Sequence, residues 1–261
     1  MDMKRTIIIG DVHGCLKELN ALLDRLMPFH PGDRVISLGD MLDKGPDSVG
    51  VVRRLMGIGT ELVLGNHEEK LLRYLAHEKR IADFRAANPK SQAPKNPMEP
   101  GKLQSYLDAF TAEELDYLAS AKTYIDLVRH NAIVVHGGIA PDLKALPTTE
   151  AIGLKGKDKS IVGKMIRTRY VSKDSGKMLP IGEQGPEDPF WADVYDGRFG
   201  SVFFGHDPAI DKVRHFPNAK GIDTGCVFGG SLTAAVINET GEVYCESVKA
   251  FEKYAESMYT E

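Results

Sequence analysis

Five short apolar segments of this chain each end at a polar cluster that combines glycine with Asp, His or Asn. They are residues 6–14 (TIIIGDVHG), 35–46 (VISLGDMLDKGP), 61–69 (ELVLGNHEE), 132–138 (AIVVHGG) and 201–207 (SVFFGHD). Runs of this length that are rich in Ile, Val and Phe are typical of strands buried on both faces. Open α/β sheets bind ligands at the carboxyl ends of their strands. The pattern therefore predicts an α/β fold with one site where the strand ends converge.

The bulk composition favours a single globular domain. With 261 residues, of which 42% are hydrophobic, the chain can bury a large core, and we predict one domain over residues 1–261. A net charge of −4 gives no general attraction to nucleic acid or to an anionic membrane. No apolar run approaches the length of a membrane span. We therefore expect neither duplex DNA nor a membrane as a partner.

The cysteines and the first residues indicate a cytoplasmic protein. Cys15, Cys226 and Cys245 are odd in number and far apart in sequence, which is unlike a disulfide framework and suits a reducing compartment. The apolar run that follows Lys4 and Arg5 is too short for a signal peptide. We expect the chain to be located in the cytoplasm.

Strand and helix patterns alternate in the first part of the chain. Apolar residues at helical spacing predict helices over residues 16–26, after Pro46 and after the cluster at 66–69. A strand–helix–strand order implies parallel neighbouring strands with right-handed crossovers. Residues 231–238 and 242–248 flank a short polar turn and predict a terminal hairpin.

An insertion is expected between two strands of the core. Residues 88–101 (NPKSQAPKNPMEPG) contain four prolines and predict a loop, and helical periodicity returns over residues 103–122. We assign residues 77–122 to this insertion. Two interpretations stay open, a cap beside the site or a surface loop without a role. The basic stretch 144–177 is either a solvated face or an attractor of anions.

The polar clusters offer the side chains of a metal centre. Residues i and i+2 of an extended segment point the same way, so Asp11 and His13 can bind one cation. Asp40 can bridge two cations. The set of candidate ligands is completed by residues that close the remaining strands, namely Asn66, His136 and His206. Carboxylate, imidazole and amide ligands together suit Mn²⁺, Co²⁺, Fe²⁺ or Zn²⁺ better than Ca²⁺. The other histidines, His30, His77, His130 and His215, are expected to be structural or solvent-exposed.

Two neighbouring divalent ions would make hydroxide available at neutral pH and would hold the oxygens of a phosphoryl group during in-line attack. Such a reaction also needs a proton for the leaving oxygen and positive charge on the phosphate. His67 directly follows Asn66 and is the candidate general acid, with Asp43 as the residue that fixes its tautomer. The candidates for binding phosphate are Lys44, Arg167 and Arg169.

The motifs GDVHG, GDMLDKGP, GNHE, HGG and FGH, in this order between residues 7 and 207, resemble those of the calcineurin-like metallophosphoesterases in the phosphoprotein phosphatase superfamily. The resemblance implies a central β-sandwich of two mixed sheets flanked by helices, with a dimetal site at its edge, Mn²⁺ being the first candidate ion. It implies that Asp11, His13 and Asp40 bind one metal. It also implies that Asp40, Asn66, His136 and His206 bind the other, with His67 as proton donor and Asp43 as its partner.

Within the superfamily, two further features resemble the symmetrical bis(5′-nucleosyl)-tetraphosphatases and ApaH-like phosphatases. One is the stretch GIDTGCVFGGSLTA at residues 221–234, and the other is TRYV around Arg169. Lys44 stands where most of the superfamily has arginine, and a lysine is familiar from the ApaH-like branch. Lysine is a compact point charge and lacks the two-pronged geometry of arginine, which weakens the case for a conventional protein phosphatase. Gly137 replaces a common alanine without touching the ligands.

Three functions follow from these observations. The leading one is dimetal-dependent hydrolysis of phosphoanhydride bonds in nucleoside polyphosphates, with diadenosine tetraphosphate, capped RNA or polyphosphate as substrates and nucleoside diphosphate as the expected product of a dinucleoside tetraphosphate. The alternative is a serine/threonine or dual-specificity protein phosphatase, whose catalytic core is the same. The third is a non-catalytic, metal-dependent binding protein. The aromatic residues Phe190, Trp191, Tyr195 and Phe228 either stack on a base or pack beneath the last strands.

Overall fold

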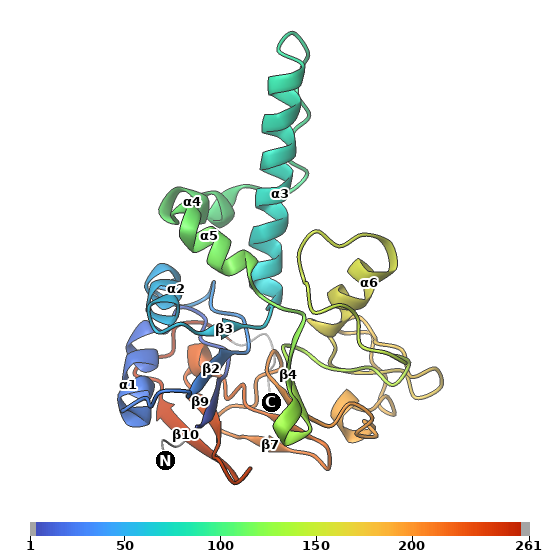
Figure 1. Cartoon of the computed structure of the whole chain (residues 1–261). Helices are drawn as coiled ribbons and strands as arrows, with labels where there is room; N and C mark the ends of the chain where they lie inside the picture. Colours follow the sequence, from blue (N-terminus) through green and yellow to red (C-terminus); the bar gives the residue numbers. More distant parts are fainter. Residues whose placement is uncertain (1–3, 257–261) are drawn as a thin grey trace.

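Two five-stranded mixed sheets form a β-sandwich in the computed structural model, which describes residues 4–256 (Figure 1). The first sheet has the order β10-β9-β1-β2-β3, with β1 (Thr6–Ile9), β2 (Arg34–Ser37), β3 (Glu61–Leu62), β9 (Ser231–Ile237) and β10 (Val243–Lys249). The second has the order β4-β5-β6-β8-β7, with β4 (Tyr124–Leu127), β5 (Ala132–Val135), β6 (Ser201–Phe204), β7 (Arg214–His215) and β8 (Ala219–Gly221). The expected sandwich of two mixed sheets is confirmed.

The pairing of the strands follows the sequence patterns. Strands β1, β2 and β3 are parallel neighbours, and so are β5 and β6. Strands β9 and β10 form the expected antiparallel hairpin, and β9 also pairs antiparallel with β1. The parallel strands of each sheet therefore present their carboxyl ends at the same edge, which is the geometry that collects the polar clusters.

Strand β1 is buried on both faces because its side chains enter two different cores. Ile8 packs between the sheets with Ile36, Val134 and Phe203, whereas Ile7 packs in the core beneath the helices of the first sheet. Successive side chains of a strand point to opposite faces. The continuous apolar run at residues 6–9 is thus explained by its position in the middle layer, and the expectation of a doubly buried strand is confirmed.

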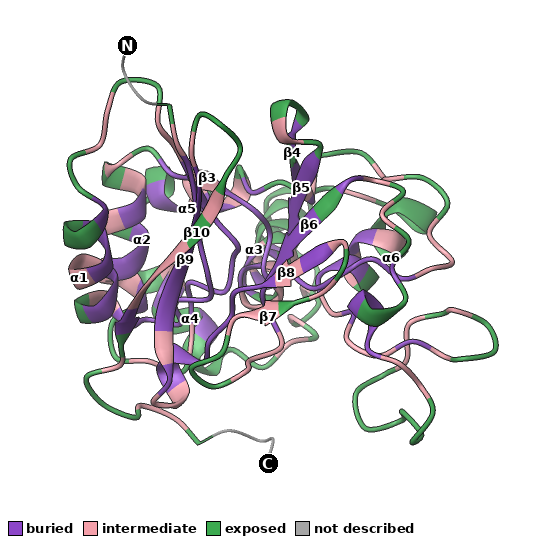
Figure 2. Ribbon diagram, turned by 90° about the horizontal axis from the view of Figure 1, so that it is seen from below, coloured by how far each residue is buried: buried purple, intermediate pink, exposed green. Residues whose placement is uncertain are grey.

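Helices cover the outer faces of both sheets (Figure 2). The helices α1 (Leu16–Leu26) and α2 (Ser48–Gly57) lie against the first sheet, and α6 (Gly156–Met165) lies on the side of the second sheet. The described part of the chain also contains three short 3-10 helices, η1 (Val128–His130), η2 (Trp191–Asp193) and η3 (Cys226–Phe228). Phe190, Trp191 and Tyr195 are buried in the core of the second sheet, so these three aromatic residues pack and do not stack on a ligand.

The insertion is built from three helices. The long helix α3 (Asn66–Ala87) projects from the sandwich, a loop over residues 88–100 returns beside it, and α4 (Gly101–Ala109) and α5 (Ala112–Ala119) follow (Figure 1). The expected loop is confirmed. The helical periodicity expected over residues 103–122 corresponds to two helices, because Thr111 and Glu114 form a reciprocal capping box that starts a new helix. Residue 77 lies inside α3, and the limits 77–122 of the insertion stay a prediction. None of the helices in residues 4–256 has the length and apolar character of a membrane span.

Candidate metal centre

Every candidate metal ligand follows the carboxyl end of a strand. Asp11 and His13 follow β1, Asp40 follows β2, Asn66 starts α3 after β3, and the two remaining candidates, His136 and His206, follow β5 and β6. His13, Asp40 and His206 have positive φ angles of 45°, 50° and 69°. Non-glycine residues adopt this left-handed region at a cost of about 1–3 kcal/mol, and such strain concentrates at functional sites.

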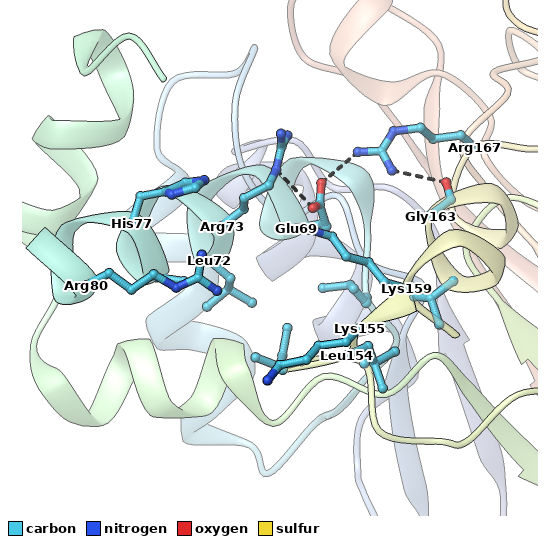
Figure 3. Close-up of a pocket in the computed structure, with 16 residues that line it drawn as sticks. Glu69, Leu72, Arg73, His77, Arg80, Leu154, Lys155, Lys159, Gly163 and Arg167 are labelled. Carbon is cyan, nitrogen blue, oxygen red and sulfur yellow. Dashed lines mark hydrogen bonds and ion pairs between the residues drawn. The ribbon is translucent and has the colours of Figure 1, made fainter. Parts of the chain in front are cut away.

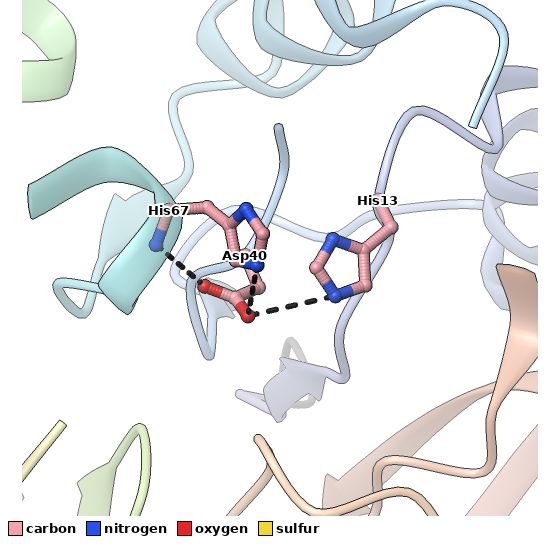
Figure 4. Close-up of side chains that lie close together, drawn as sticks. All are labelled: His13, Asp40 and His67. Carbon is pink, nitrogen blue, oxygen red and sulfur yellow. Dashed lines mark hydrogen bonds and ion pairs between the residues drawn. The ribbon is translucent and has the colours of Figure 1, made fainter. Parts of the chain in front are cut away.

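Asp40 lies at the middle of the cluster, as Figure 4 shows for two of its neighbours. Its Oδ2 is 3.5 Å from Nε2 of His13 and 3.8 Å from Nε2 of His67, while its Oδ1 is 3.3 Å from Nε2 of His136. One carboxylate therefore faces imidazoles on both of its oxygens. Burial alone would raise the pKa of Asp40, but His136 and His67 outweigh it and hold the pKa well below its usual range.

A second group of ligands lies on the other side of Asp40. Nε2 of His136 is 3.1 Å from Oδ1 of Asn66, and the rings of His136 and His206 are 5.0 Å apart between centroids. Ligand atoms of Asp40, His136 and His206 all lie within 4.8 Å of one another, as do those of Asp40, His13 and His67. Two cation positions that share the Asp40 carboxylate therefore fit this arrangement.

Asp11 joins the cluster through His206. Its Oδ2 accepts a hydrogen bond of 3.0 Å from the backbone N–H of His206. Among the buried side-chain atoms without a hydrogen-bond partner in residues 4–256, two belong to this cluster, namely Oδ1 of Asp11 and Nε2 of His206. Buried polar atoms are rarely left without a partner because desolvating them is costly. A carboxylate oxygen and an imidazole nitrogen that are both free in this way suit a divalent cation.

Backbone carbonyls fix the orientation of two imidazoles. Nδ1 of His13 lies 2.8 Å from the carbonyl oxygen of Leu42, and Nδ1 of His136 lies 2.8 Å from that of Leu38. A carbonyl can only accept, so each Nδ1 carries the proton and each Nε2 offers its lone pair to the centre. Burial lowers the pKa of His13 to about 3 and holds that of His206 well below its ordinary value. The imidazoles of His13 and His206 are therefore neutral, as metal ligation requires.

His67 and Asp43 form a pair beside the ligands. Nδ1 of His67 lies 2.5 Å from Oδ2 of Asp43. Burial opposes ionisation of Asp43, but the hydrogen bond from His67 outweighs it and lowers the pKa to about 2. Burial would also lower the pKa of His67, but the charges of Asp40 and Asp43 raise it above its ordinary value. The structure thus brings together an ionised carboxylate and an imidazole that retains its proton.

The three candidate phosphate ligands have different surroundings. Nζ of Lys44 lies at the centre, 2.8 Å from Nε2 of His13. Arg169 donates to the carbonyl of His206 at 3.0 Å and to Asp207 at 2.9 Å, so it lies next to the ligands. Arg167 instead donates to Glu69 at 2.8 Å and lines a separate cavity. The two arginines therefore have different partners, and only Arg169 contacts the ligand cluster.

Residues 4–233 match the calcineurin-like phosphoesterase family. The chain belongs to this family. A calcineurin-like phosphoesterase is a metal-dependent phosphohydrolase with a dinuclear metal centre, which agrees with two ligand groups sharing Asp40. The family assignment, the enzyme class and the fold expected from the sequence motifs are confirmed.

Curated relatives of this calcineurin-like phosphoesterase match over most of their length. A Geobacillus thermodenitrificans protein named bis(5′-nucleosyl)-tetraphosphatase PrpE [asymmetrical] is 29% identical, with 87% of this chain and 88% of the relative covered. A Janthinobacterium protein named bis(5′-nucleosyl)-tetraphosphatase, symmetrical, is 26% identical, with 92% and 96% covered. A crystal structure described as that of a candidate diadenosine tetraphosphatase superposes with a TM-score of 0.67 at 28% identity, covering 95% of this chain and 94% of the other.

Two residues of this phosphoesterase centre were not singled out from the sequence. The buried carboxylate of Glu68 accepts hydrogen bonds from the backbone N–H groups of Asp40, Met41 and Leu42, at 2.7, 2.9 and 3.2 Å, and so holds the loop that carries Asp40. Burial raises its pKa to about 7. Asp223 is buried beside Asp11, and burial raises its pKa to about 6. Both lie inside recognised motifs, at the end of GNHE and in GIDTGC, which was the available signal.

Proposed function

We propose that this phosphoesterase hydrolyses phosphoanhydride bonds in nucleoside polyphosphates, with dinucleoside tetraphosphates as its principal substrates. The observation that carries the proposal is the likeness, over nearly their whole length, to relatives named bis(5′-nucleosyl)-tetraphosphatase. The GIDTGC stretch and Lys44 support the same choice over a protein phosphatase. Capped RNA and polyphosphate have the same kind of bond and are secondary candidates.

We assign the metal ligands as two sets that share one carboxylate. Asp11, His13 and Asp40 would hold one ion, and the second ion would be held by Asp40 together with Asn66, His136 and His206. The close approach of the imidazoles to Asp40 and the partnerless oxygen of Asp11 support this assignment. Mn²⁺ is the first candidate, with Co²⁺, Fe²⁺ or Zn²⁺ as alternatives. When bound, the pair would supply hydroxide at neutral pH and polarise the phosphoryl oxygens.

His67 would deliver the proton to the leaving oxygen. Its Nδ1 is held by Asp43, which leaves Nε2 directed toward the centre, 3.8 Å from Asp40. The raised pKa of His67 keeps the imidazolium available near neutral pH. Asp43 acts as the positioning residue because its carboxylate fixes the tautomer and stabilises the charged form.

Lys44 and Arg169 would bind the phosphoryl group. Lys44 already points its ammonium into the cluster, and the guanidinium of Arg169 donates to the backbone carbonyl of His206. Both charges would stabilise the negative charge that develops on the equatorial oxygens. Arg167 follows α6, has a carboxylate partner in Glu69 of α3 and lines the separate cavity, so we assign it to a more distant part of the substrate.

The experiment is a side-by-side assay with Mn²⁺ of diadenosine tetraphosphate, capped RNA, polyphosphate and a phosphopeptide. We expect the dinucleoside tetraphosphate to be turned over with the highest kcat/KM, and His67→Asn to reduce that rate strongly. Product analysis decides which bond breaks: two nucleoside diphosphates mark symmetrical cleavage, and a monophosphate with a triphosphate marks asymmetrical cleavage. Turnover restricted to the phosphopeptide would contradict the proposal and support a protein phosphatase.

We also propose a cytoplasmic location. All three cysteines are free thiols, and two of them, Cys15 and Cys226, are buried. Free thiols suit a reducing compartment. Fractionation of cells that express a tagged chain would test this, and recovery in an oxidising or membrane fraction would contradict it.

A further inference from the structure

A cavity of about 510 Å³ opens between α3 and the segment that leads into α6 (Figure 3). One wall is the face of α3 that carries Glu69, Arg73 and Arg80, and the other is formed by residues 151–163. Ligand sites for small molecules commonly have volumes of about 300–1,000 Å³. The cavity is therefore large enough for a nucleotide, and it lies outside the ligand cluster described above.

The cavity is strongly basic although the chain is acidic. Its lining contains five cationic side chains, Arg73, Arg80, Lys155, Lys159 and Arg167, against the single carboxylate of Glu69. Arg73 and Arg167 both contact Glu69, at 3.1 and 2.8 Å. Within residues 4–256, no ion pair is found for Arg80, Lys155 or Lys159. In a protein of net charge −4, three cations without counter-charges at one cavity indicate an anionic ligand.

The cavity continues the surface of the metal centre. Residues three or four apart on a helix are neighbours, and Asn66, Glu69, Arg73, His77 and Arg80 follow this spacing along one face of α3. Asn66 belongs to the ligand cluster and the other four line the cavity. With a rise of 1.5 Å per residue, Arg80 lies about 21 Å along the helix from Asn66. This distance is comparable to the length of a dinucleoside polyphosphate whose reacting phosphate is bound at the metal centre.

The floor of the cavity is apolar. Leu64, Leu72, Leu154 and Val162 line it beneath the rim of cations. His77, expected to be structural or solvent-exposed, also lines the cavity, and an imidazole ring can stack on a base. An apolar floor with a cationic rim suits a ligand with a flat apolar ring and several phosphates. Inorganic polyphosphate would use only the rim.

We infer that this cavity binds the nucleotide at the far end of the substrate, with Arg80, Lys155 and Lys159 on its phosphates and the apolar floor beneath its base. The inference rests on the proposed function, since it names a second subsite for the same substrate class. It makes the cavity a determinant of specificity, and the chemistry at the metal centre does not depend on it.

The first test compares two double variants in α6 and in the residue directly before it, Lys155. Lys155→Glu/Lys159→Glu reverses charges that line the cavity, whereas Lys157→Glu/Lys164→Glu reverses two exposed charges on the same helix that do not line it. We expect the first to raise KM for diadenosine tetraphosphate about tenfold or more, with kcat and the hydrolysis of p-nitrophenyl phosphate unchanged. An equal effect of the control pair, or an equal loss with p-nitrophenyl phosphate, would overturn the inference.

The second test needs no turnover and no change of charge. Ala76→Trp would fill the cavity, which Ala76 lines on an exposed part of α3. Calorimetric titration with ADP and with pyrophosphate is expected to show that ADP binds more tightly than pyrophosphate to the wild type and that Ala76→Trp removes most of the difference. Equal binding of ADP by both proteins would overturn the inference. Because the titration measures binding directly, it tests the cavity even if diadenosine tetraphosphate is not hydrolysed.

Discussion

The hydroxyl of Tyr106 donates a hydrogen bond of 3.1 Å to Oδ1 of Asp43, so the inserted helix α4 reaches the carboxylate that orients His67. The same hydroxyl accepts from the backbone N–H of Asp43 at 3.0 Å and lies 3.0 Å from Oγ of Ser48. Asp43 has a positive φ of 68°, and this network holds it in that conformation. The contact supports a cap beside the site over a surface loop without a role.

Tyr106→Phe should therefore lower kcat toward dinucleoside tetraphosphate about three- to tenfold, the loss expected from one hydrogen bond of about 1 kcal/mol. The control is Tyr74→Phe, which removes a hydroxyl that contacts Gln104 within the same insertion and does not touch Asp43. Steady-state kinetics of both variants would decide. If both lost activity equally, the effect would come from the insertion as a whole and not from the contact with Asp43.

Asp43→Asn should move the alkaline limb of the pH–rate profile to lower pH. His67 acts as an acid, so activity falls as pH rises through its pKa. The charges of Asp40 and Asp43 raise that pKa, and removing the Asp43 charge leaves less support for the imidazolium. The profile of kcat between pH 6 and 10 measures the shift to lower pH. An unmoved alkaline limb would show that another group supplies the proton.

Gly205→Ala should disrupt the centre through Asp11. A Cβ atom at Gly205 would lie 2.0 Å from Oδ1 of Asp11, so the carboxylate would have to move. Displacing a reacting group by about 1 Å can reduce the rate about a hundredfold. Gly57→Ala is the control, since a Cβ there has no atom within 4 Å and the residue ends α2. Full activity of Gly205→Ala with bound Mn²⁺ would contradict the role of Asp11.

The sequence allowed the ligand cluster to be predicted because each ligand is adjacent to a strong strand signal. Parallel strands place their carboxyl ends at one edge of a sheet, so Asp11 lies near Asp40 at the edge of the first sheet and His136 lies near His206 at the edge of the second. His67 and Asp43 also follow from their neighbours Asn66 and Asp40. This logic is short-ranged, since it uses only the strand signal directly before each residue, and the roles of these residues stay a prediction.

Contacts between elements that are distant along the chain could not be predicted in this way. Tyr106 lies 63 residues from Asp43. The helical periodicity around Tyr106 predicts only that its side chain is buried, as it is, and does not predict the hydrogen bond of its hydroxyl. Arg167 and Arg169 are two residues apart but bind different partners, because Arg167 lies in the turn that ends α6 and Arg169 lies after that turn. Propensity describes each segment separately, whereas these positions depend on how segments pack.

Asp33→Asn should destabilise the fold in a pH-dependent manner. The Asp33 carboxylate accepts from the backbone N–H and guanidinium of Arg5 and from the N–H of His30. Burial would raise the pKa of Asp33, but the hydrogen bonds from Arg5 outweigh it and lower the pKa. A lowered folded-state pKa gives stability that is present above the unfolded value near 4 and is lost as pH falls through the folded value.

Urea unfolding at pH 7 should show a loss of about 1–3 kcal/mol for Asp33→Asn, shrinking toward zero below about pH 4. Asp24→Asn, at an exposed residue of α1, is the control and should leave the free energy of unfolding within about 0.5 kcal/mol of the wild type. A difference of the same size at every pH would show that the variant acts by something other than the charge of Asp33.

Removal of metal should abolish activity and lower thermal stability together. Burial, Asp223 and Asp40 raise the pKa of Asp11, which shows how costly a negative charge is at this position without a cation. A ligand that binds only the folded state stabilises it by about 2.7 kcal/mol at 100 times its Kd. We therefore expect exhaustive chelation to eliminate turnover, and saturating Mn²⁺ to restore it and raise Tm by about 5 °C or more. Asp40→Asn should remove this rise because Asp40 belongs to both ligand sets, whereas Asp24→Asn should retain it. Activity that survived complete chelation would refute the metal centre.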